Sequence, residues 1–353
     1  MAVKNIAGNP RMKTELLIRA GGEKTGTAYI FSGAENTGKS FAALQFAKIL
    51  NCLDPGDGGD CCEKCENCVL LEKIFHRLDS DGMQTIPHPD ALYINTDKAQ
   101  IVIDMVLDRL SEMNSYRPVK LKKKIIMVND AEKLNSVASN AILKELEEPN
   151  ENVVIMLIVN NMEKMLPTIV SRCHKINVKR VPLKEIKSIL ETEYGWDPEK
   201  ASRAVMFCDG KIGAAFEYEK IKEKVDYVKG IFSVISGTAD DVEGIFEKIE
   251  EIDGLKKAKK GKKDVNIRLF LLDILKILSY IYKDILLEKL SVKRTIEAKY
   301  GLNPAQIKSY TEKQLVKILE LIEEAQRETA AANINLLVAD LFFNIRKAGL
   351  SRD

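Results

Sequence analysis

Residues 33–40 (GAENTGKS) have the composition and spacing of a phosphate-binding loop. They match the pattern G-x-x-x-x-G-K-S/T, and they lie between the β-rich run 27–31 and the apolar helical run 41–50. In such a P-loop, backbone N–H groups and the helix N-terminus bind phosphate, the lysine reaches the terminal phosphates, and the hydroxyl binds Mg²⁺. Six residues would hold ATP and Mg²⁺ if this loop binds nucleotide: Gly33, Asn36, Thr37, Gly38, Lys39 and Ser40.

Four cysteines follow the P-loop helix with the spacing C-x₉-C-x₂-C-x₂-C, at Cys52, Cys62, Cys65 and Cys68. Two overlapping C-x₂-C steps present three thiolates in one tight turn, and Cys52 can complete a tetrahedron, which suits a structural Zn²⁺. Cys61 is expected to lie outside this shell. The alternative is a set of reduced cysteines without a metal, but the polar residues between them offer no core in which to bury them.

Polar residues also follow two strand-like runs. Asn129 and Asp130 come directly after 125–128, where a P-loop ATPase carries an acidic pair that holds Mg²⁺ and orients the attacking water. Here the first position is a neutral amide, and the second is one methylene shorter than glutamate. Asn160 and Asn161 follow 153–159, where a polar residue can sense the γ-phosphate. The sequence thus predicts weak or absent hydrolysis, although binding of ATP stays open.

The runs 27–31, 92–95, 125–128 and 153–159 alternate with helical patterns, which predicts an α/β fold with a parallel sheet covered by helices. A helix from Ser136 to just before Pro149 carries one apolar stripe. Beyond about residue 180 the chain is helical, with helices expected at 184–194, 198–208, 228–236 and 267–290. We divide the chain into 1–180, with the cysteine module at 52–68, a small helical domain at 181–225, and a helical bundle at 226–353.

The composition excludes several classes of protein. With 353 residues, 45% hydrophobic and 30% charged, the chain can form two or three globular domains and is neither disordered nor fibrous. Its net charge is only +2, so a nucleic-acid contact would need a local basic patch. The longest apolar run, 153–159, is too short to span a membrane, and the N-terminus lacks the apolar core of a signal peptide. We expect a cytoplasmic protein, in which clustered cysteines indicate a metal site.

Taken together, these motifs resemble the clamp-loader subunits of bacterial DNA polymerase III, the gamma/tau and delta-prime subunits. The resemblance is specific over about residues 1–225. It rests on the P-loop, the cysteine module directly after the P-loop helix, and four short motifs: 88–90 (HPD), 115–118 (SYRP), 143–149 (LKELEEP) and 171–173 (SRC). Beyond 225 it is weaker, where 333–335 (NIN) precedes an apolar helix.

The resemblance implies a RecA-like AAA+ core with a zinc knuckle, a helical lid and an all-α collar that joins five subunits. It also implies the task, which is ATP-dependent loading of the sliding clamp onto primer–template DNA together with gamma/tau and delta subunits. Arg172 of the SRC motif would be an arginine finger that acts in trans on a neighbour's ATP. In isolation, this arginine could equally form a surface salt bridge.

Two departures from the gamma/tau pattern favour the delta-prime type: Asn129 with Asp130 in place of the acidic pair, and Gly213 where those subunits carry a lid arginine. The alternative is a catalytically active gamma/tau-type motor subunit, since the P-loop is complete. A third interpretation is a separate zinc-containing nucleic-acid-binding protein. It would depend on four lysines, Lys120, Lys122, Lys123 and Lys124, which are more often a solvated face.

Overall fold

The computed structural model describes residues 6–22, 27–76, 88–95, 101, 113, 116–236, 267–290, 310–329 and 333–350. Ser115 of the SYRP motif lies outside these ranges. The chain forms two compact units, residues 1–216 and 217–353. Among the described residues, no helix is both long enough and apolar enough to cross a membrane.

The first unit is built on a sheet of parallel strands in the order β2-β3-β4-β1-β5. The strands are β1 (Ala28–Ser32), β2 (Ala91–Ile94), β3 (Lys124–Val128), β4 (Val153–Val159) and β5 (His174–Asn177). The first four coincide with the predicted runs to within a residue or two, and the parallel α/β fold is confirmed. Because β4 lies between β3 and β1, the residues that follow these three strands meet at one edge of the sheet.

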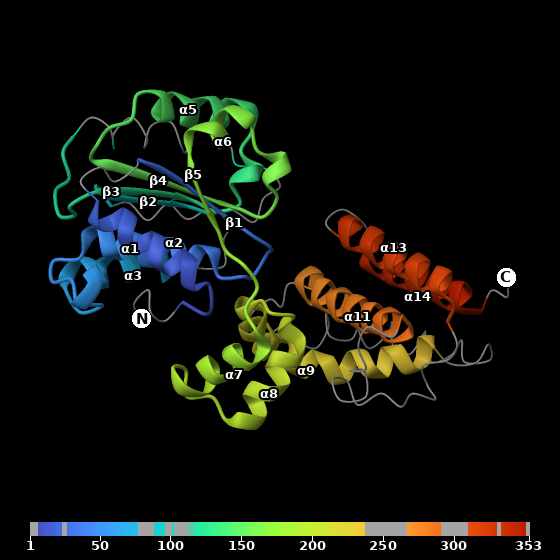
Figure 1. The fold of residues 1–353 in the computed structure, drawn as a ribbon. Coiled ribbons are helices and arrows are strands. Elements are labelled where there is room, and N and C mark those ends of the chain that lie inside the picture. Colours follow the sequence, from blue (N-terminus) through green and yellow to red (C-terminus); the bar gives the residue numbers. More distant parts are fainter. Residues whose placement is uncertain are drawn as a thin grey trace, which may run out of the picture. The chain divides into compact units, whose positions relative to one another are not determined.

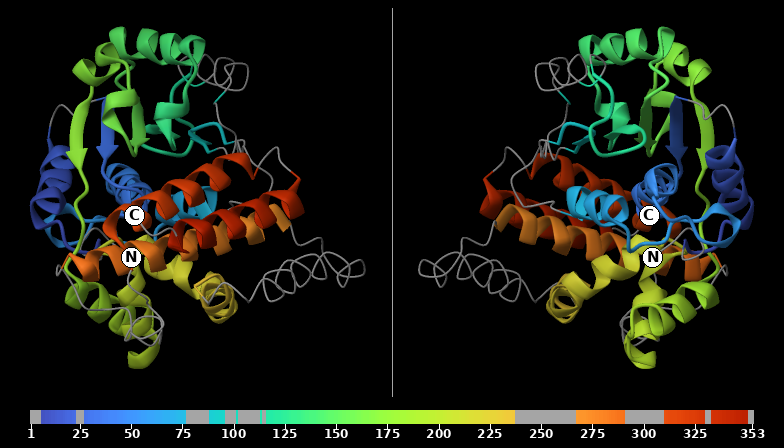
Figure 2. Two further views of the ribbon diagram at one scale, coloured as in Figure 1. Left: turned by 90° about the vertical axis from the view of Figure 1, so that its right-hand side faces the viewer. Right: turned by 90° about the vertical axis from the view of Figure 1, so that its left-hand side faces the viewer.

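Helices cover both faces of the sheet (Figures 1 and 2). One layer contains α1 (Pro10–Gly21), α2 (Lys39–Asn51) and α3 (Glu66–His76); the other contains α5 (Ser136–Glu147) and α6 (Pro167–Arg172). Alternate residues of β1 show how the layers form: Tyr29 and Phe31 pack into the core beneath α2, and Ile30 packs into the core beneath α5. Burial of both faces explains why β3 and β4 are continuous apolar runs.

Short 3₁₀ turns connect several of these elements: η2 (Asp57–Gly59) lies in the cysteine module, η3 (Ala131–Lys133) follows β3, and η4 (Met162–Lys164) follows β4. After β5 come α7 (Leu183–Thr192), α8 (Pro198–Cys208) and α9 (Ile212–Ile235). The boundary between the compact units lies inside α9, and the predicted boundary at residues 225/226 lies in the same helix.

The described part of the second unit is helical. It contains α11 (Ile267–Lys289), α13 (Glu312–Glu328) and α14 (Ile334–Leu350) as well as the last part of α9. Helix α13 packs against both α11 and α14 (Figure 1). It begins at a capping box, in which Thr311 and Gln314 each bond the other's backbone N–H. Its apolar face, which includes Leu315, Ile318 and Ile322, is fully buried.

Candidate nucleotide site and cysteine cluster

The P-loop connects β1 to α2 through backbone conformations that favour glycine. Gly38 has φ +93°, and a Cβ atom at Gly33 would lie 2.3 Å from the carbonyl oxygen of Val178. No side chain fits at Gly33, so its glycine is required by the close approach of the chain that leaves β5. Asn36 also has a positive φ, of 63°. The two glycines that the motif specifies are therefore suited to the shape of the loop.

Lys39 begins α2 and is almost completely buried, with 5% of its surface exposed. Its Nζ donates to the carbonyl oxygen of Ala34 and to Oδ1 of Asn160, both at 2.8 Å. Burial lowers the pKa of Lys39 below its usual value, and nearby carboxylates, Asp130 first, oppose this shift only in part. The lysine is thus held at the carboxyl edge of the sheet, beside the residues that follow β4.

Asn160 connects this lysine to the remaining acidic residue after β3. Its Nδ2 donates to Asp130 Oδ1 at 2.7 Å, and Asp130 Oδ2 pairs with Lys133 Nζ at 2.8 Å. Both carboxylate oxygens of Asp130 are therefore engaged within the chain. Ser40 Oγ donates to the amide oxygen of Asn129 at 3.1 Å, so the P-loop hydroxyl faces a neutral amide where an acidic residue would bind Mg²⁺.

Asn161 lies apart from this group. Its side chain accepts from the backbone N–H of Glu163 at 2.9 Å and caps η4. Two residues that the sequence did not single out belong to the network instead. Glu132 Oε1 accepts from the backbone N–H of Asn160 at 3.0 Å, and Asn95 Oδ1 accepts from Asn129 Nδ2 at 2.9 Å. Both come from turns just beyond strands, where polar residues are common, and neither has a distinctive pattern.

The beginning of α9 touches the P-loop from another side. The backbone N–H of Gly213 donates to the carbonyl oxygen of Asn36 at 2.8 Å. A Cβ atom at Gly213 would lie 3.0 Å from that oxygen, so the absence of a side chain permits the contact. Gly213 therefore packs directly on the P-loop backbone.

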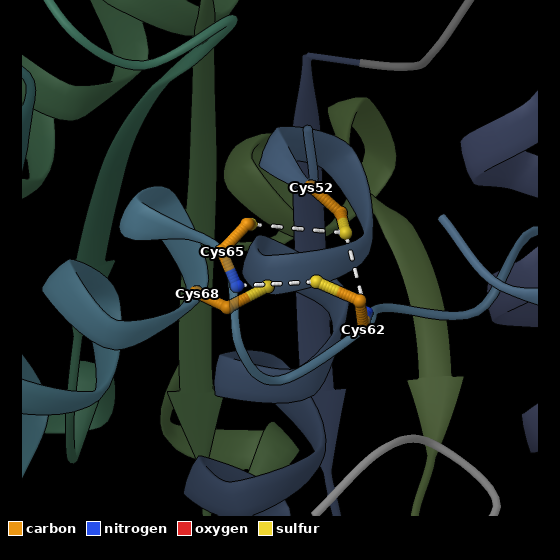
Figure 3. A group of neighbouring side chains, drawn as sticks. All are labelled: Cys52, Cys62, Cys65 and Cys68. Carbon is orange, nitrogen blue, oxygen red and sulfur yellow. Dashed lines mark hydrogen bonds between the residues drawn. The ribbon is translucent and has the colours of Figure 1, made fainter. Parts of the chain in front are cut away.

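Four cysteine side chains converge just beyond α2 (Figure 3). The sulfur atoms of Cys52, Cys62, Cys65 and Cys68 all lie within 4.8 Å of one another. Backbone N–H groups point at them: that of Cys62 lies 3.2 Å from Cys52 Sγ, and that of Cys65 lies 3.2 Å from Cys62 Sγ. Four sulfurs with N–H donors suit a tetrahedral ion that prefers thiolates, as Zn²⁺ does.

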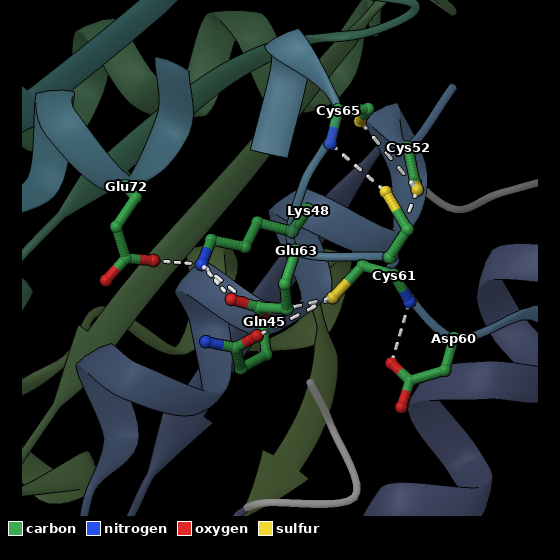
Figure 4. A network of polar contacts seen from close by, with 9 residues as sticks. Gln45, Lys48, Cys52, Asp60, Cys61, Glu63, Cys65 and Glu72 are labelled. Atoms are coloured by element: carbon green, nitrogen blue, oxygen red, sulfur yellow. Dashed lines mark hydrogen bonds and ion pairs between the residues drawn. The ribbon is translucent and has the colours of Figure 1, made fainter. Parts of the chain in front are cut away.

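The thiols of the cluster differ in pKa: burial raises the pKa of Cys52 to about 12, whereas the pKa of Cys65 is lowered. Burial raises the pKa of Cys65, but the backbone N–H groups of Leu53 and Cys68, with the neighbouring thiols, lower it to about 6 overall. Cys61 lies beside the cluster, and its Sγ donates to Gln45 Oε1 at 3.7 Å and to Glu63 Oε1 at 3.4 Å (Figure 4). The Cys61 sulfur is therefore directed at Gln45 and Glu63 and is not one of the four converging sulfurs.

Arg172 is the last residue of α6 and is partly exposed. Its Nη2 lies 3.1 Å from Oε1 of Glu147, at the end of α5, and its Nη1 donates to the carbonyl oxygen of Thr168 at 3.1 Å. The SRC and LKELEEP motifs therefore meet through an ion pair near the surface. Within this chain the guanidinium contacts α5 and its own helix.

The HPD motif contacts the residues that directly follow the SYRP motif. The carboxylate of Asp90 is buried and accepts from the backbone N–H groups of Val119, Lys120 and Leu121 at 2.6–3.0 Å. Burial is the largest influence and raises the pKa of Asp90, but these N–H groups and His88 lower it overall below its usual value. Asp90 therefore fixes the turn that leads into β3.

The four lysines around the start of β3 all contact groups of the chain itself. Lys124 is buried, and its Nζ donates to the carbonyl oxygen of Met113 at 2.9 Å. The other three contact Glu66 (Lys120), the carbonyl oxygen of Cys52 (Lys122) and that of Glu151 (Lys123).

Comparison with known proteins agrees with this arrangement. Residues 8–182 match the protein family described as "DNA polymerase III, delta subunit". The DNA polymerase III subunit delta' of Bacillus subtilis is 36% identical over 163 residues, which are 46% of this chain and 45% of that protein. The gamma/tau subunit of Mycobacterium tuberculosis H37Rv is 27% identical over 186 residues, which are 52% of this chain and 30% of that protein.

A solved structure extends the likeness of fold. A gamma subunit-related protein of DNA polymerase III from Thermotoga maritima has a TM-score of 0.52 and 17% identity, with 96% of this chain and 99% of that chain covered. The sequence matches span less than half of the two relatives' lengths. Over residues 8–182, this chain is therefore similar to the DNA polymerase III delta subunit family.

Proposed function

We propose that this chain is a clamp-loader subunit of a DNA polymerase III holoenzyme, of the delta-prime type. In this role it assembles with gamma/tau and delta subunits and helps to place a sliding clamp around primer–template DNA in an ATP-dependent cycle. The family match of residues 8–182 and the identity to a delta' subunit support the proposal. It implies that 1–180 is an AAA+ core, 181–225 a lid and 226–353 a collar that joins subunits.

The observation that carries the delta-prime assignment is the contact of Ser40 Oγ with the amide of Asn129 at 3.1 Å. A P-loop motor needs a negative charge there to hold Mg²⁺. The acidic residue that remains, Asp130, is held by Asn160 and Lys133. We infer that the chain binds ATP with residues 33–40 but hydrolyses it slowly or not at all.

We further propose that Cys52, Cys62, Cys65 and Cys68 hold a structural Zn²⁺. Their convergence within 4.8 Å and the N–H groups directed at the sulfurs support this. Such an ion fixes the loop between α2 and α3 and supplies folding free energy. With four protein ligands, a tetrahedral ion has no open position for a substrate.

Arg172 is proposed to act in trans on the ATP of a neighbouring subunit. A guanidinium is permanently charged and can bridge γ-phosphate oxygens as charge develops there. Its position at the end of α6, partly exposed and in contact with α5 and its own helix, supports this role. The ion pair with Glu147 would be exchanged for phosphate when subunits meet.

The test is a reconstituted complex with gamma/tau and delta subunits in which only this chain carries Arg172→Ala. We expect a defined pentamer that assembles normally, while clamp-stimulated hydrolysis at the adjacent site falls by up to ~10³-fold. Arg180→Ala is the matched control, because Arg180 also forms an exposed ion pair, with Asp209. Undiminished hydrolysis and clamp loading with Arg172→Ala, or failure to form the pentamer, would contradict the proposal.

The complete P-loop favours one second candidate, a gamma/tau-type motor subunit. Lys39 and Ser40 are both in place at the start of α2. A motor would turn over ATP as a purified chain, and Lys39→Ala would abolish that turnover. The two functions are therefore separated by the ATPase rate of the unmodified chain.

A further inference from the structure

A buried lysine joins the helix that follows the P-loop to the cysteine module (Figure 4). Only 1% of the Lys48 side chain is exposed. Its Nζ lies 3.2 Å from Oε2 of Glu63, which stands between Cys62 and Cys65, and it also pairs with Glu72 of α3. An unpaired buried ammonium group is very unfavourable, so Lys48 depends on these two carboxylates.

Helix α2 links the two candidate sites directly. Its first residue is the P-loop lysine, Lys39, and its last residue, Asn51, precedes Cys52. At 1.5 Å per residue, its 13 residues span about 20 Å. Residues 42–51 are all buried, so a displacement at one end is not absorbed by exposed turns.

Further contacts attach the cysteine end of α2 to the module. The carbonyl oxygen of Asn51 accepts from Nδ2 of Asn67 at 3.0 Å. Glu63, which pairs with Lys48, also accepts from the thiol of Cys61 at 3.4 Å, and the same thiol donates to Gln45 of α2. Polar groups of the module therefore meet three turns of one helix.

We propose that Lys48 is a positioning residue through which the four-cysteine module sets the affinity of the P-loop for nucleotide. The proposal rests on the nucleotide and zinc binding proposed above. A bound ion fixes the loop that carries Glu63, so the carboxylate stays in register with Lys48 and the helix keeps its position. Loss of the ion releases Glu63, leaves Lys48 poorly paired, and displaces the helix that begins at Lys39.

The alternative is a purely structural ion cluster that stabilises the fold without affecting the P-loop. Coupling through Lys48 and a purely structural cluster predict different values of one measurable quantity. It is the ratio of the nucleotide affinity with zinc to the nucleotide affinity without zinc. Coupled sites typically change each other's affinity by about 5–150-fold, and the effect is reciprocal. A purely structural cluster leaves that ratio at one.

The experiment measures the affinity for a non-hydrolysable ATP analogue by calorimetry, in zinc-loaded and chelator-stripped protein. For the parent chain, we expect stripping to weaken binding by about tenfold. For Lys48→Met, which keeps the length of the side chain but not its charge, we expect a ratio near one. By reciprocity, saturating analogue should tighten zinc binding by the same factor in the parent, as measured by chelator competition.

Two further variants separate coupling from damage to the fold. Lys73→Met makes the same chemical change at an exposed lysine of α3, next to Glu72, and should retain the parent's ratio. Because Lys48→Met removes the lysine that pairs with both Glu63 and Glu72, a variant with Glu63→Gln and Glu72→Gln added removes all three charges of this cluster. We expect this variant to fold, to bind zinc and to show a ratio near one.

An affinity ratio of one in the parent would overturn the proposal. So would a ratio equal to the parent's in both Lys48→Met and the variant that lacks all three charges. If the zinc-loaded parent binds no analogue, the proposed nucleotide function fails. Amide hydrogen exchange of residues 33–40 then tests whether the cysteine module is coupled to the P-loop. Exchange that zinc slows in the parent but not in Lys48→Met would support the coupling. Exchange that is independent of zinc in the parent would refute it.

Discussion

The buried carboxylate of Asp90 allows a quantitative prediction. Asp90→Asn keeps the shape of the side chain but replaces one acceptor oxygen by an N–H₂ group and removes the charge. Three backbone N–H groups, those of residues 119–121, lose a charged acceptor. Hydrogen bonds to charged groups contribute about 1.5–3 kcal/mol and neutral ones about 0.5–1.5. A loss of about 1 kcal/mol for each bond lowers the free energy of unfolding by about 3 kcal/mol.

The effect depends on pH in a defined direction. The pKa of Asp90 in the folded chain lies below the usual value of 3.8, so its carboxylate stabilises the fold above that pH. This stabilisation is lost as the pH falls through the folded pKa. The difference between the parent and Asp90→Asn should therefore be constant from pH 7 to pH 5 and shrink below about pH 4.

Urea unfolding followed by tryptophan fluorescence measures this difference, because the single tryptophan, Trp196, belongs to the same compact unit as Asp90. Asp209→Asn is the matched control. Its carboxylate forms only an exposed pair with Arg180, and its positive φ suits asparagine, so the loss should stay within about 1 kcal/mol. Equal stability of Asp90→Asn and the parent at pH 7, or an undiminished difference at pH 3, would refute the reasoning.

Three further predictions concern the candidate sites. Metal analysis should find one zinc per chain in the parent and in Cys61→Ser but none in Cys62→Ser. The reverse pattern would show that Cys61, and not Cys62, is the ligand. Asn160→Ala removes an acceptor from Lys39 and should weaken binding of an ATP analogue about tenfold, whereas Asn161→Ala should not; equal effects would contradict the observed geometry. The unmodified chain alone should hydrolyse ATP at least ~10²-fold more slowly than a motor subunit. Lys39→Ala should leave this low rate unchanged.

The central strands could be predicted because both of their faces are buried. The runs that form β3 and β4 contain almost only apolar residues, and few other structures produce such patterns. The sequence did not reveal β5, whose residues are exposed except for Ile176. A strand at the edge of a sheet with one buried side chain has the composition of a loop.

The candidate sites, like the strands, could be predicted only in part. The P-loop and the four cysteines depend on local spacing, which the sequence displays directly. The choice between Asn160 and Asn161 depends on which side chain turns towards Lys39 at the end of β4, and two adjacent asparagines give no indication of it. Glu132 and the contact of Gly213 with the P-loop depend on tertiary packing between distant segments.

The edge strand β5 also affects how the chain can associate. An edge strand offers unpaired backbone groups to which another strand can add, and exposed polar and charged side chains oppose such addition. In β5, His174, Lys175 and Asn177 are all exposed, and the strand has only four residues. Continuation of the sheet into a second molecule is therefore disfavoured at this edge, which opposes strand exchange and aggregation.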